Sequence, residues 1–251
     1  MGVKSKIVIG NWKMNGSAEL VESFTRTMLD NQADYAGIRV VLCPPFTLLQ
    51  AMADALEGGP ILLGAQNVSE FEQGAHTGEI SAPMLASMGT KMVIIGHSER
   101  RASRGENDRI IAAKVKQALS VGMVPVLCVG ETAEEKARGD SEAVVWQQLS
   151  VVLHAIGSEL FGQLIVAYEP IWAIGSGSTA STDDILTITT AIHAKLAQLG
   201  IQLPLLYGGS VNAGNAAQIS SLPTISGLLV GGASLQADQF LLLCSNTAKG
   251  A

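Results

Sequence analysis

The stretch "LIVAYEPIWAIGSGSTAS", residues 164–181, joins an apolar strand-like run to a carboxylate, Glu169, and then to a loop rich in glycine and serine. A buried strand usually ends in turn residues. A carboxylate at the end of such a strand loses solvation unless it has a partner or a function. The stretch therefore predicts a buried strand that ends in a functional acid, followed by a loop that covers it.

This run is one of eight strand-like runs that alternate with helical patterns along the chain. The runs occupy residues 6–11, 39–43, 61–66, 92–96, 124–130, 164–169, 205–209 and 228–232. Dividing the chain by eight gives about 31 residues per unit, the size of a strand with its crossover helix. The pattern predicts an α/β fold, a single (β/α)8 barrel domain spanning residues 1–251.

The alternative fold is an open doubly wound sheet. That fold favours a glycine-rich fingerprint in the first turn, whereas the first run here is followed by "NWKMNG". The barrel is therefore the simpler interpretation.

Helical periodicity is clear in three segments between the runs. They start at Ser17, Asp108 and Ser141, and the last two read "DRIIAAKVKQALS" and "SEAVVWQQLSVVLHAI". Ser17 is the predicted N-cap of the first segment. The face predicted to be buried there carries Leu20, Phe24, Thr27 and Met28.

Composition and charge exclude several classes of function. Hydrophobic residues make up 47% of the chain and charged residues 15%, as expected for strands that are buried on both faces. No apolar run is long enough to span a bilayer, so no membrane interaction is predicted. The net charge of −6 comes without a dense basic tract, which argues against nucleic acid as a partner. The arginines of residues 99–109 alternate with acids and predict a solvated, self-paired face.

The cysteines and the N-terminus indicate a cytoplasmic protein. Cys43, Cys128 and Cys244 are widely spaced and form no zinc or C-x-x-C motif, which favours a reducing compartment. The first residues contain too short an apolar run for a signal peptide.

Chemistry-bearing residues follow several of the strand-like runs. Asn11 and Lys13 follow the first run, His97 and Glu99 the fourth, and Glu169 the sixth. Glycine-rich "YGGS" and "VGGAS" end the seventh and eighth. Active sites of such barrels lie where strands end, and the loops after strands 7 and 8 commonly bind phosphate. An acid, an imidazole, an ammonium and a phosphate cradle are therefore predicted to converge.

Each signal also has a simpler interpretation. Lys13 alone reads as a surface lysine, and the glycines as tight turns. The other histidines, His76, His154 and His193, are predicted to be structural, because no H-x-H or H-E-x-x-H spacing supports a metal site. The order of the signals along the chain, rather than any single one, favours the functional interpretation.

Eight motifs give the whole chain a family resemblance. They are "GNWKMN" (10–15), "AQN" (65–67), "GAHTGEIS" (74–81), "GHSERR" (96–101), "CVGE" (128–131), "AYEPIWAIG" (167–175), "YGGSV" (207–211) and "VGGASL" (230–235). With these motifs in this order, the chain resembles the triosephosphate isomerase family.

The resemblance implies interconversion of dihydroxyacetone phosphate and D-glyceraldehyde 3-phosphate through an enediolate, without cofactor or metal. It implies that Glu169 is the base, that His97 polarises the carbonyl as a neutral imidazole, and that Lys13 stabilises negative charge. Asn11 and Lys13 would hold the substrate. Backbone N–H groups would bind the phosphate at Gly175, Ser210, Gly231 and Gly232.

The resemblance also implies a homodimer. In it the 66–80 loop docks beside the other active site, with Thr77 near the partner's Asn11 and Lys13. His76 stands where the family more often has an aromatic residue. Ser176 and Ser178 replace bulkier family residues in the loop that closes over the site.

Two other functions compete with this interpretation. A Schiff-base aldolase using Lys13 is disfavoured because Lys13 lies in a polar loop rather than on an apolar strand. A phosphate-binding scaffold on an inactive barrel is disfavoured because the set of Asn11, Lys13, His97 and Glu169 is intact.

Overall fold

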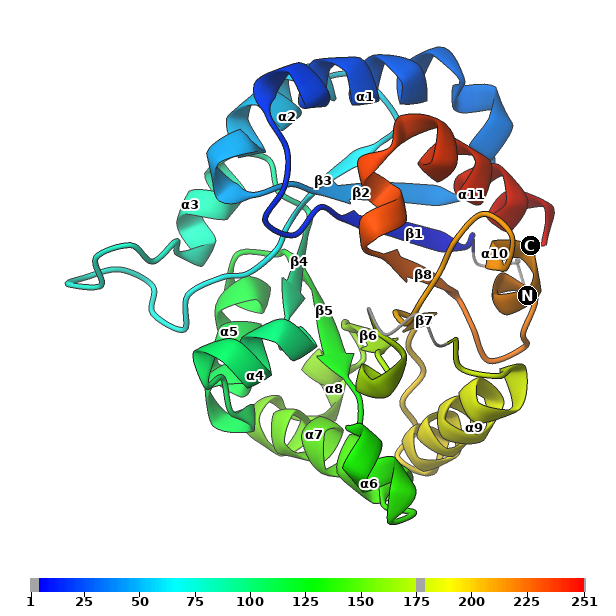
Figure 1. The fold of residues 1–251 in the computed structure, drawn as a ribbon. Helices are drawn as coiled ribbons and strands as arrows, with labels where there is room; N and C mark the ends of the chain where they lie inside the picture. The colour runs from blue at the N-terminus through cyan, green and yellow to red at the C-terminus, as the bar shows by residue number, and fades with distance from the viewer. Residues whose placement is uncertain (1–4, 175–178, 251) are drawn as a thin grey trace.

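The computed structural model describes residues 5–174 and 179–250, and within them eight parallel strands close into a barrel (Figure 1). The strands are β1 (Ile7–Asn11), β2 (Arg39–Cys43), β3 (Leu62–Ala65), β4 (Met92–Ile95), β5 (Val124–Val129), β6 (Ile165–Tyr168), β7 (Leu205–Tyr207) and β8 (Gly227–Val230). Each coincides with a predicted run to within two residues at either end. Strand order follows chain order around the barrel, so neighbouring strands are always consecutive units.

The barrel closes where β8 pairs with β1. Ile7 lies opposite Gly227, and a Cβ on Gly227 would stand 1.9 Å from the carbonyl oxygen of Ile7. Only glycine permits that approach of the two backbones. Because β1 and β8 pair, the described strands leave no open edge, so the predicted barrel is confirmed and the open doubly wound sheet is excluded.

Helices surround the barrel (Figure 1). They are α1 (Ala18–Asp30), α2 (Leu49–Ala55), α3 (Ala82–Ser87), α4 (Ser98–Arg104), α5 (Asp108–Ser120), α6 (Ala133–Ala137), α7 (Ser141–Ile156), α8 (Ser158–Phe161), α9 (Thr182–Gln198), α10 (Ala216–Ser220) and α11 (Ala237–Lys249). Short 3-10 turns are η1 (Gln32–Tyr35), η2 (Phe46–Leu48), η3 (Ile171–Ala173) and η4 (Gly232–Leu235).

The three predicted helical segments form α1, α5 and α7. The predicted cap of α1 is confirmed, because the Ser17 hydroxyl accepts a hydrogen bond from the backbone N–H of Leu20 at 3.2 Å. The predicted buried face is right at Phe24 and Met28 and wrong at its other two positions. Val21 and Thr25 are buried, whereas Leu20 and Thr27 are only partly buried, because the stripe that faces the barrel runs through Val21, Phe24, Thr25 and Met28.

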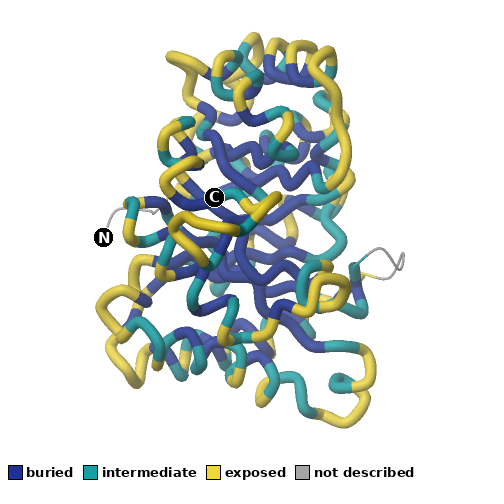
Figure 2. Tube along the Cα trace, turned by 90° about the vertical axis from the view of Figure 1, so that its left-hand side faces the viewer, coloured by how far each residue is buried: buried dark blue, intermediate teal, exposed yellow. Residues whose placement is uncertain are grey.

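Two apolar cores hold the barrel together. Inward-facing side chains such as Ile9, Val41, Ile94 and Val126 fill the barrel interior. A larger core fills the layer between the strands and the helices. Figure 2 shows the buried chain concentrated at the centre and the exposed chain at the periphery.

The loop after β3 extends beyond the ring of helices, where Figure 1 draws it in cyan. It carries Phe71, which is 44% exposed and stacks on His76 with ring centroids 3.8 Å apart. Within the described residues, no helix has the length and apolarity that crossing a membrane requires.

Candidate active site

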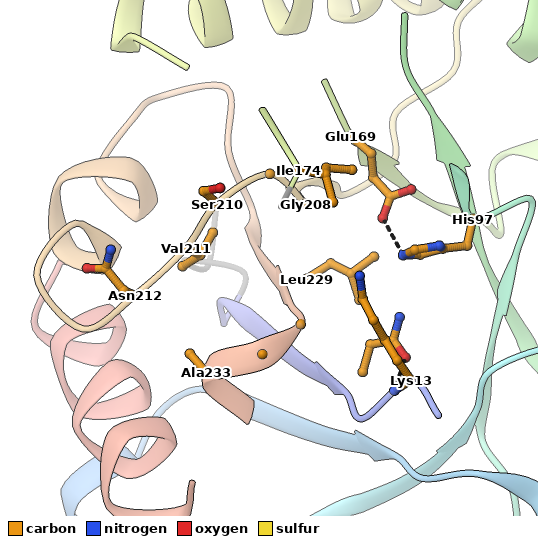
Figure 3. Close-up of a pocket in the computed structure, with 14 residues that line it drawn as sticks. Lys13, His97, Glu169, Ile174, Gly208, Ser210, Val211, Asn212, Leu229 and Ala233 are labelled. Atoms are coloured by element: carbon orange, nitrogen blue, oxygen red, sulfur yellow. Dashed lines mark hydrogen bonds and ion pairs between the residues drawn. The ribbon is translucent and has the colours of Figure 1, made fainter. Parts of the chain in front are cut away.

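A pocket of about 290 Å³ opens where the carboxyl ends of the strands meet (Figure 3). Seven of the eight predicted site residues line it: Asn11, Lys13, His97, Glu169, Ser210, Gly231 and Gly232. They lie at the ends of five different strands or in the loops that follow them, so the barrel brings together residues that are far apart in the sequence. The predicted convergence is therefore observed.

Glu169 follows β6 directly and is 2% exposed. Its backbone N–H donates to the carbonyl of Val129 at 2.8 Å, which continues the β5–β6 ladder by one residue. The backbone N–H of Ser98 donates to Oε2 at 3.3 Å. A Cβ on Gly208 would stand 2.8 Å from Cγ of Glu169, so the side chain occupies space that only a glycine leaves free.

His97 points toward Glu169, with Nε2 3.3 Å from Oε1 (Figure 3). The ring is the N-cap of α4, and its Nδ1 accepts a hydrogen bond from the backbone N–H of Glu99 at 3.2 Å. An accepting Nδ1 carries no proton, so in the neutral ring the proton resides on Nε2. His97 can thus donate a hydrogen bond into the pocket without carrying a charge.

Lys13 has a constrained backbone. Its φ is 52°, its N–H donates to Oδ1 of Asn11 at 3.0 Å, and its carbonyl accepts from Nε2 of Gln66 at 2.8 Å. Its ammonium lies 2.6 Å from Oε1 of Glu99. The side chain is therefore held from both ends, at its backbone and at its ammonium.

The pKa of Glu99 reflects this pairing. Partial burial acts to raise the pKa, but the hydrogen bond and the positive charge of Lys13 lower it below its ordinary value. Glu99 is 54% exposed on its side chain, so it keeps its charge beside Lys13 in contact with water.

The glycine-rich loops line another wall of the pocket. Gly231 precedes η4, and a Cβ there would stand 3.2 Å from Cε of Lys13. A Cβ on Gly232 would meet nothing within 4 Å. The hydroxyl of Ser210 donates to the carbonyl of Ala173 at 2.6 Å, which ties the β7 loop to the loop after Glu169. Backbone at Gly231 and Gly232 therefore faces the pocket without intervening side chains.

Three residues named from the sequence, Gly175, Ser176 and Ser178, lie outside the described residues. Among residues 5–174 and 179–250, no group of three His, Cys, Asp or Glu side chains is arranged to hold a metal ion.

Cys128, on β5, lies inside the barrel beneath the acid. Burial, and next the charge of Glu169, raise the pKa of its thiol well above the ordinary value. The three cysteines are buried and unbridged. The Cys128 thiol therefore stays protonated and unreactive, and its S–H can donate a hydrogen bond to the carboxylate of Glu169.

Sequence reasoning assigned no role to Glu131 and Gln66. Oε1 of Glu131 accepts from Nε1 of Trp172 at 2.8 Å and from the hydroxyl of Tyr168 at 3.1 Å. Burial, and next Glu131, raise the pKa of Tyr168. Both residues lie in quoted motifs after strand ends, the same signal that found Glu169.

The arginine-rich segment 99–109 is self-paired, as predicted. Arg100 pairs with Glu106 at 2.6 Å, and Arg101 with Asp108 at 2.6 Å. The prediction that this face is solvated is wrong at Glu106, which is 6% exposed and also pairs with the buried Lys114 at 2.5 Å. Burial lowers the pKa of Lys114 against the opposing effect of Glu106.

The fold and the site together define a (β/α)8 barrel in which a carboxylate and an imidazole at the strand ends face two glycine-rich loops. A family model described as triosephosphate isomerase matches residues 6–247. A protein from Alcanivorax borkumensis named triosephosphate isomerase is 49% identical over 246 residues, which cover 96% of this chain and 98% of that protein. One of the same name from Halorhodospira halophila is 44% identical, over 99% of this chain and 100% of that protein.

A solved structure agrees with these sequence matches. The crystal structure of triosephosphate isomerase from Bartonella henselae superposes with a TM-score of 0.87 at 38% identity, covering 96% of this chain and 98% of that one. The chain belongs to the triosephosphate isomerase family, and it is an isomerase. The family predicted from the motifs is confirmed.

Proposed function

We propose that the protein interconverts dihydroxyacetone phosphate and D-glyceraldehyde 3-phosphate by proton transfer through an enediolate, a step of glycolysis and gluconeogenesis. The observation that carries the proposal is the 3.3 Å approach of His97 Nε2 to Glu169 Oε1 in a pocket walled by Gly231 and Gly232. A carboxylate base, a hydrogen-bond donor and an anion cradle are what this reaction requires.

Glu169 acts as the base that moves a proton between the two substrate carbons. The hydrogen bond from Ser98 holds Oε2, while Oε1 faces the imidazole. The substrate displaces the contact between Oε1 and His97 and lies between them. The carboxylate is then within reach of the carbon-bound protons.

His97 and Lys13 stabilise the negative charge that develops on the substrate oxygens. A proton on Nε2 of His97 allows the neutral ring to donate to the carbonyl oxygen. The ammonium of Lys13 supplies positive charge, and Asn11 holds its loop through the bond to the Lys13 N–H. No cofactor or metal takes part in this scheme.

Backbone N–H groups of Ser210, Gly231 and Gly232, together with Gly175, bind the phosphate. The absence of side chains at Gly231 and Gly232 allows an anion to approach the backbone closely. The anchored phosphate places the reacting carbons between Glu169 and His97.

The active form is a homodimer through the 66–80 loop. Beside the active site lies a second hollow of about 410 Å³, lined in part by Lys13, Met14 and Glu99. Met14 is 94% exposed there, and Phe71 on the projecting loop is 44% exposed. A second copy that inserts its loop into the hollow would cover both apolar side chains.

Residues 1–251 form one barrel domain that works in the cytoplasm, with no nucleic-acid or membrane partner. The acidic net charge and the three unbridged cysteines support this assignment.

A coupled assay for glyceraldehyde 3-phosphate formation from dihydroxyacetone phosphate tests the proposed function. Rapid formation without added metal or cofactor is expected, with no adduct after borohydride treatment in the presence of substrate. Absence of isomerisation, or trapping of substrate on Lys13, would contradict the proposal.

A further inference from the structure

The carboxamide of Gln148, on α7, forms two hydrogen bonds with one residue at the end of β5. Its Oε1 accepts from the backbone N–H of Gly130 at 2.9 Å, and its Nε2 donates to the carbonyl of the same glycine at 3.0 Å. The backbone N–H and C=O of Gly130 are thus both hydrogen-bonded to one side chain from helix α7, outside the barrel.

This position lacks a strand partner on the β4 side. The carbonyls of Val129 and Glu131 point toward the chain that continues from β6, where they accept from Glu169 and Ile171. Alternate residues of a parallel strand face opposite neighbours, so Gly130 faces β4, which ends at Ile95. The amide of Gln148 takes the place of the missing strand.

Gly130 in turn lies directly against the backbone of Glu169. A Cβ on Gly130 would stand 1.8 Å from the carbonyl oxygen of Glu169 and 2.6 Å from its carbonyl carbon. The gap bordered by Gly130, Cys128 and Glu169 is too small for a water molecule. Neither water nor a flexible side chain separates the two residues, so a shift of Gly130 would displace the backbone of Glu169.

We propose that Gln148 is a positioning residue for Glu169 and acts through Gly130. The inference rests on the proposed role of Glu169 as the base. The carboxamide holds the N–H and the C=O of Gly130 in place. Because the backbone of Glu169 packs directly against Gly130, the position of Glu169 is held as well. A displacement of about 1 Å in a catalytic group can cost about 100-fold in rate, so a fraction of that displacement is measurable.

Gln148→Leu removes both hydrogen bonds while keeping a similar volume. We expect kcat to fall about tenfold while KM stays within about twofold, because the hydrogen bonds of Gln148 go to Gly130 and not to the proposed phosphate-binding residues Ser210, Gly231 and Gly232. We also expect a larger primary isotope effect on kcat with substrate deuterated at the carbon that loses its proton, because proton transfer becomes slower than product release. Gln148→Glu keeps the acceptor for the Gly130 N–H but sets a carboxylate oxygen against the Gly130 carbonyl, so its kcat should fall at least as far as that of Gln148→Leu.

Val152→Ala is the matched control, since Val152 lies one turn later on α7 and is fully buried. It should lower the melting temperature and leave kcat and the isotope effect unchanged. If Gln148→Leu does not fold, Gln148→Glu carries the test. The proposal is overturned if the Gln148 variants that fold keep parental kcat and isotope effect, or if Val152→Ala changes both equally. Glu169→Gln, measured alongside, distinguishes a failure of the Gln148 proposal from a failure of the proposed function. A fully active Glu169→Gln would refute the assignment of Glu169 as the base.

Discussion

At the scale of single residues, Lys13 combines a left-handed backbone with the proposed role of stabilising negative charge on the substrate. Its left-handed conformation costs a non-glycine residue about 1–2 kcal/mol. The hydrogen bonds from its N–H to Asn11 and from Gln66 to its carbonyl hold that conformation. In this conformation the ammonium lies beside Glu99, at the rim of the pocket that is also lined by His97 and Glu169.

Lys13→Ala and Lys13→Gly should both lower turnover and raise KM, because each removes the ammonium. The glycine variant should nevertheless be more stable than the alanine variant by about 0.5–1 kcal/mol, since relief of strain exceeds the added entropy of the unfolded chain. Urea unfolding and the coupled assay measure the two effects. Equal stability of the two variants would show that the backbone is unstrained, and parental turnover in either would remove Lys13 from the mechanism.

Sequence reasoning found the residues of the site but not their pairing. The order of Asn11, Lys13, His97 and Glu169 after strand ends was readable because a barrel places all strand ends on one face. The ion pair of Lys13 with Glu99 joins residues 86 positions apart, and no local pattern encodes it. Likewise, alternating charges in residues 99–109 indicated pairing, but the buried Glu106 also pairs with Lys114, which lies beyond that segment on α5.

At the scale of elements, the start of α9 anchors the chain that returns from the loop after Glu169. Ser181 and Asp184 form a capping box, and Asp184 also pairs with Lys136 at 2.8 Å. Lys136 lies over the ring of Trp172, 3.4 Å from its centroid, so α6, η3 and α9 meet at one ammonium. The strands and long helices were predictable from local periodicity, whereas this junction depends on the register of three separate elements.

Asp184→Asn should destabilise the protein at neutral pH by about 0.5–1 kcal/mol. The hydrogen bond from Lys136 lowers the pKa of Asp184 against the effect of partial burial, and bonds from Ser181 lower it further. A folded-state pKa below the unfolded value means that the ionised group stabilises above the unfolded pKa, and that this stability is lost as pH falls through the folded pKa. The difference between parent and variant should therefore shrink below about pH 4.

Unfolding by urea at several pH values measures this effect. Asp183→Asn is the matched control, because Asp183 is exposed in the same first turn and its side chain makes no ion pair in the described structure. A constant difference between parent and Asp184→Asn from pH 7 to pH 3 would contradict the assignment.

At the scale of the whole molecule, the barrel is closed, but the surface near the active site exposes large apolar side chains. The projecting loop and the hollow beside Lys13 both expose apolar side chains that a monomer leaves in water. Sequence alone indicated the loop through the family resemblance. The hollow is lined by the end of β1 and the residues after it, by Gln66 after β3, and by His97 and helix α4 after β4, so only the folded chain reveals it.

Met14→Glu should convert a micromolar dimer into a monomer with reduced activity, because a charge would be buried at the proposed interface. Leu242→Glu is the matched control, since Leu242 is 49% exposed on α11, outside the proposed interface. Sedimentation velocity and the coupled assay measure the outcome. A parent protein that is monomeric and fully active would rule out the dimer, as would a Met14→Glu protein that remains dimeric.

The central claim is that the carboxylate delivered by β6 is the base of the reaction. Glu169→Gln keeps the size of the side chain and its hydrogen bond from Ser98, so the fold should be retained. The direct measurement is the turnover of parent and Glu169→Gln in the coupled assay, with circular dichroism confirming equal folding. We expect turnover to fall by about 10²–10⁴-fold or more, the contribution of a positioned base. Turnover within about tenfold of the parent would contradict the account.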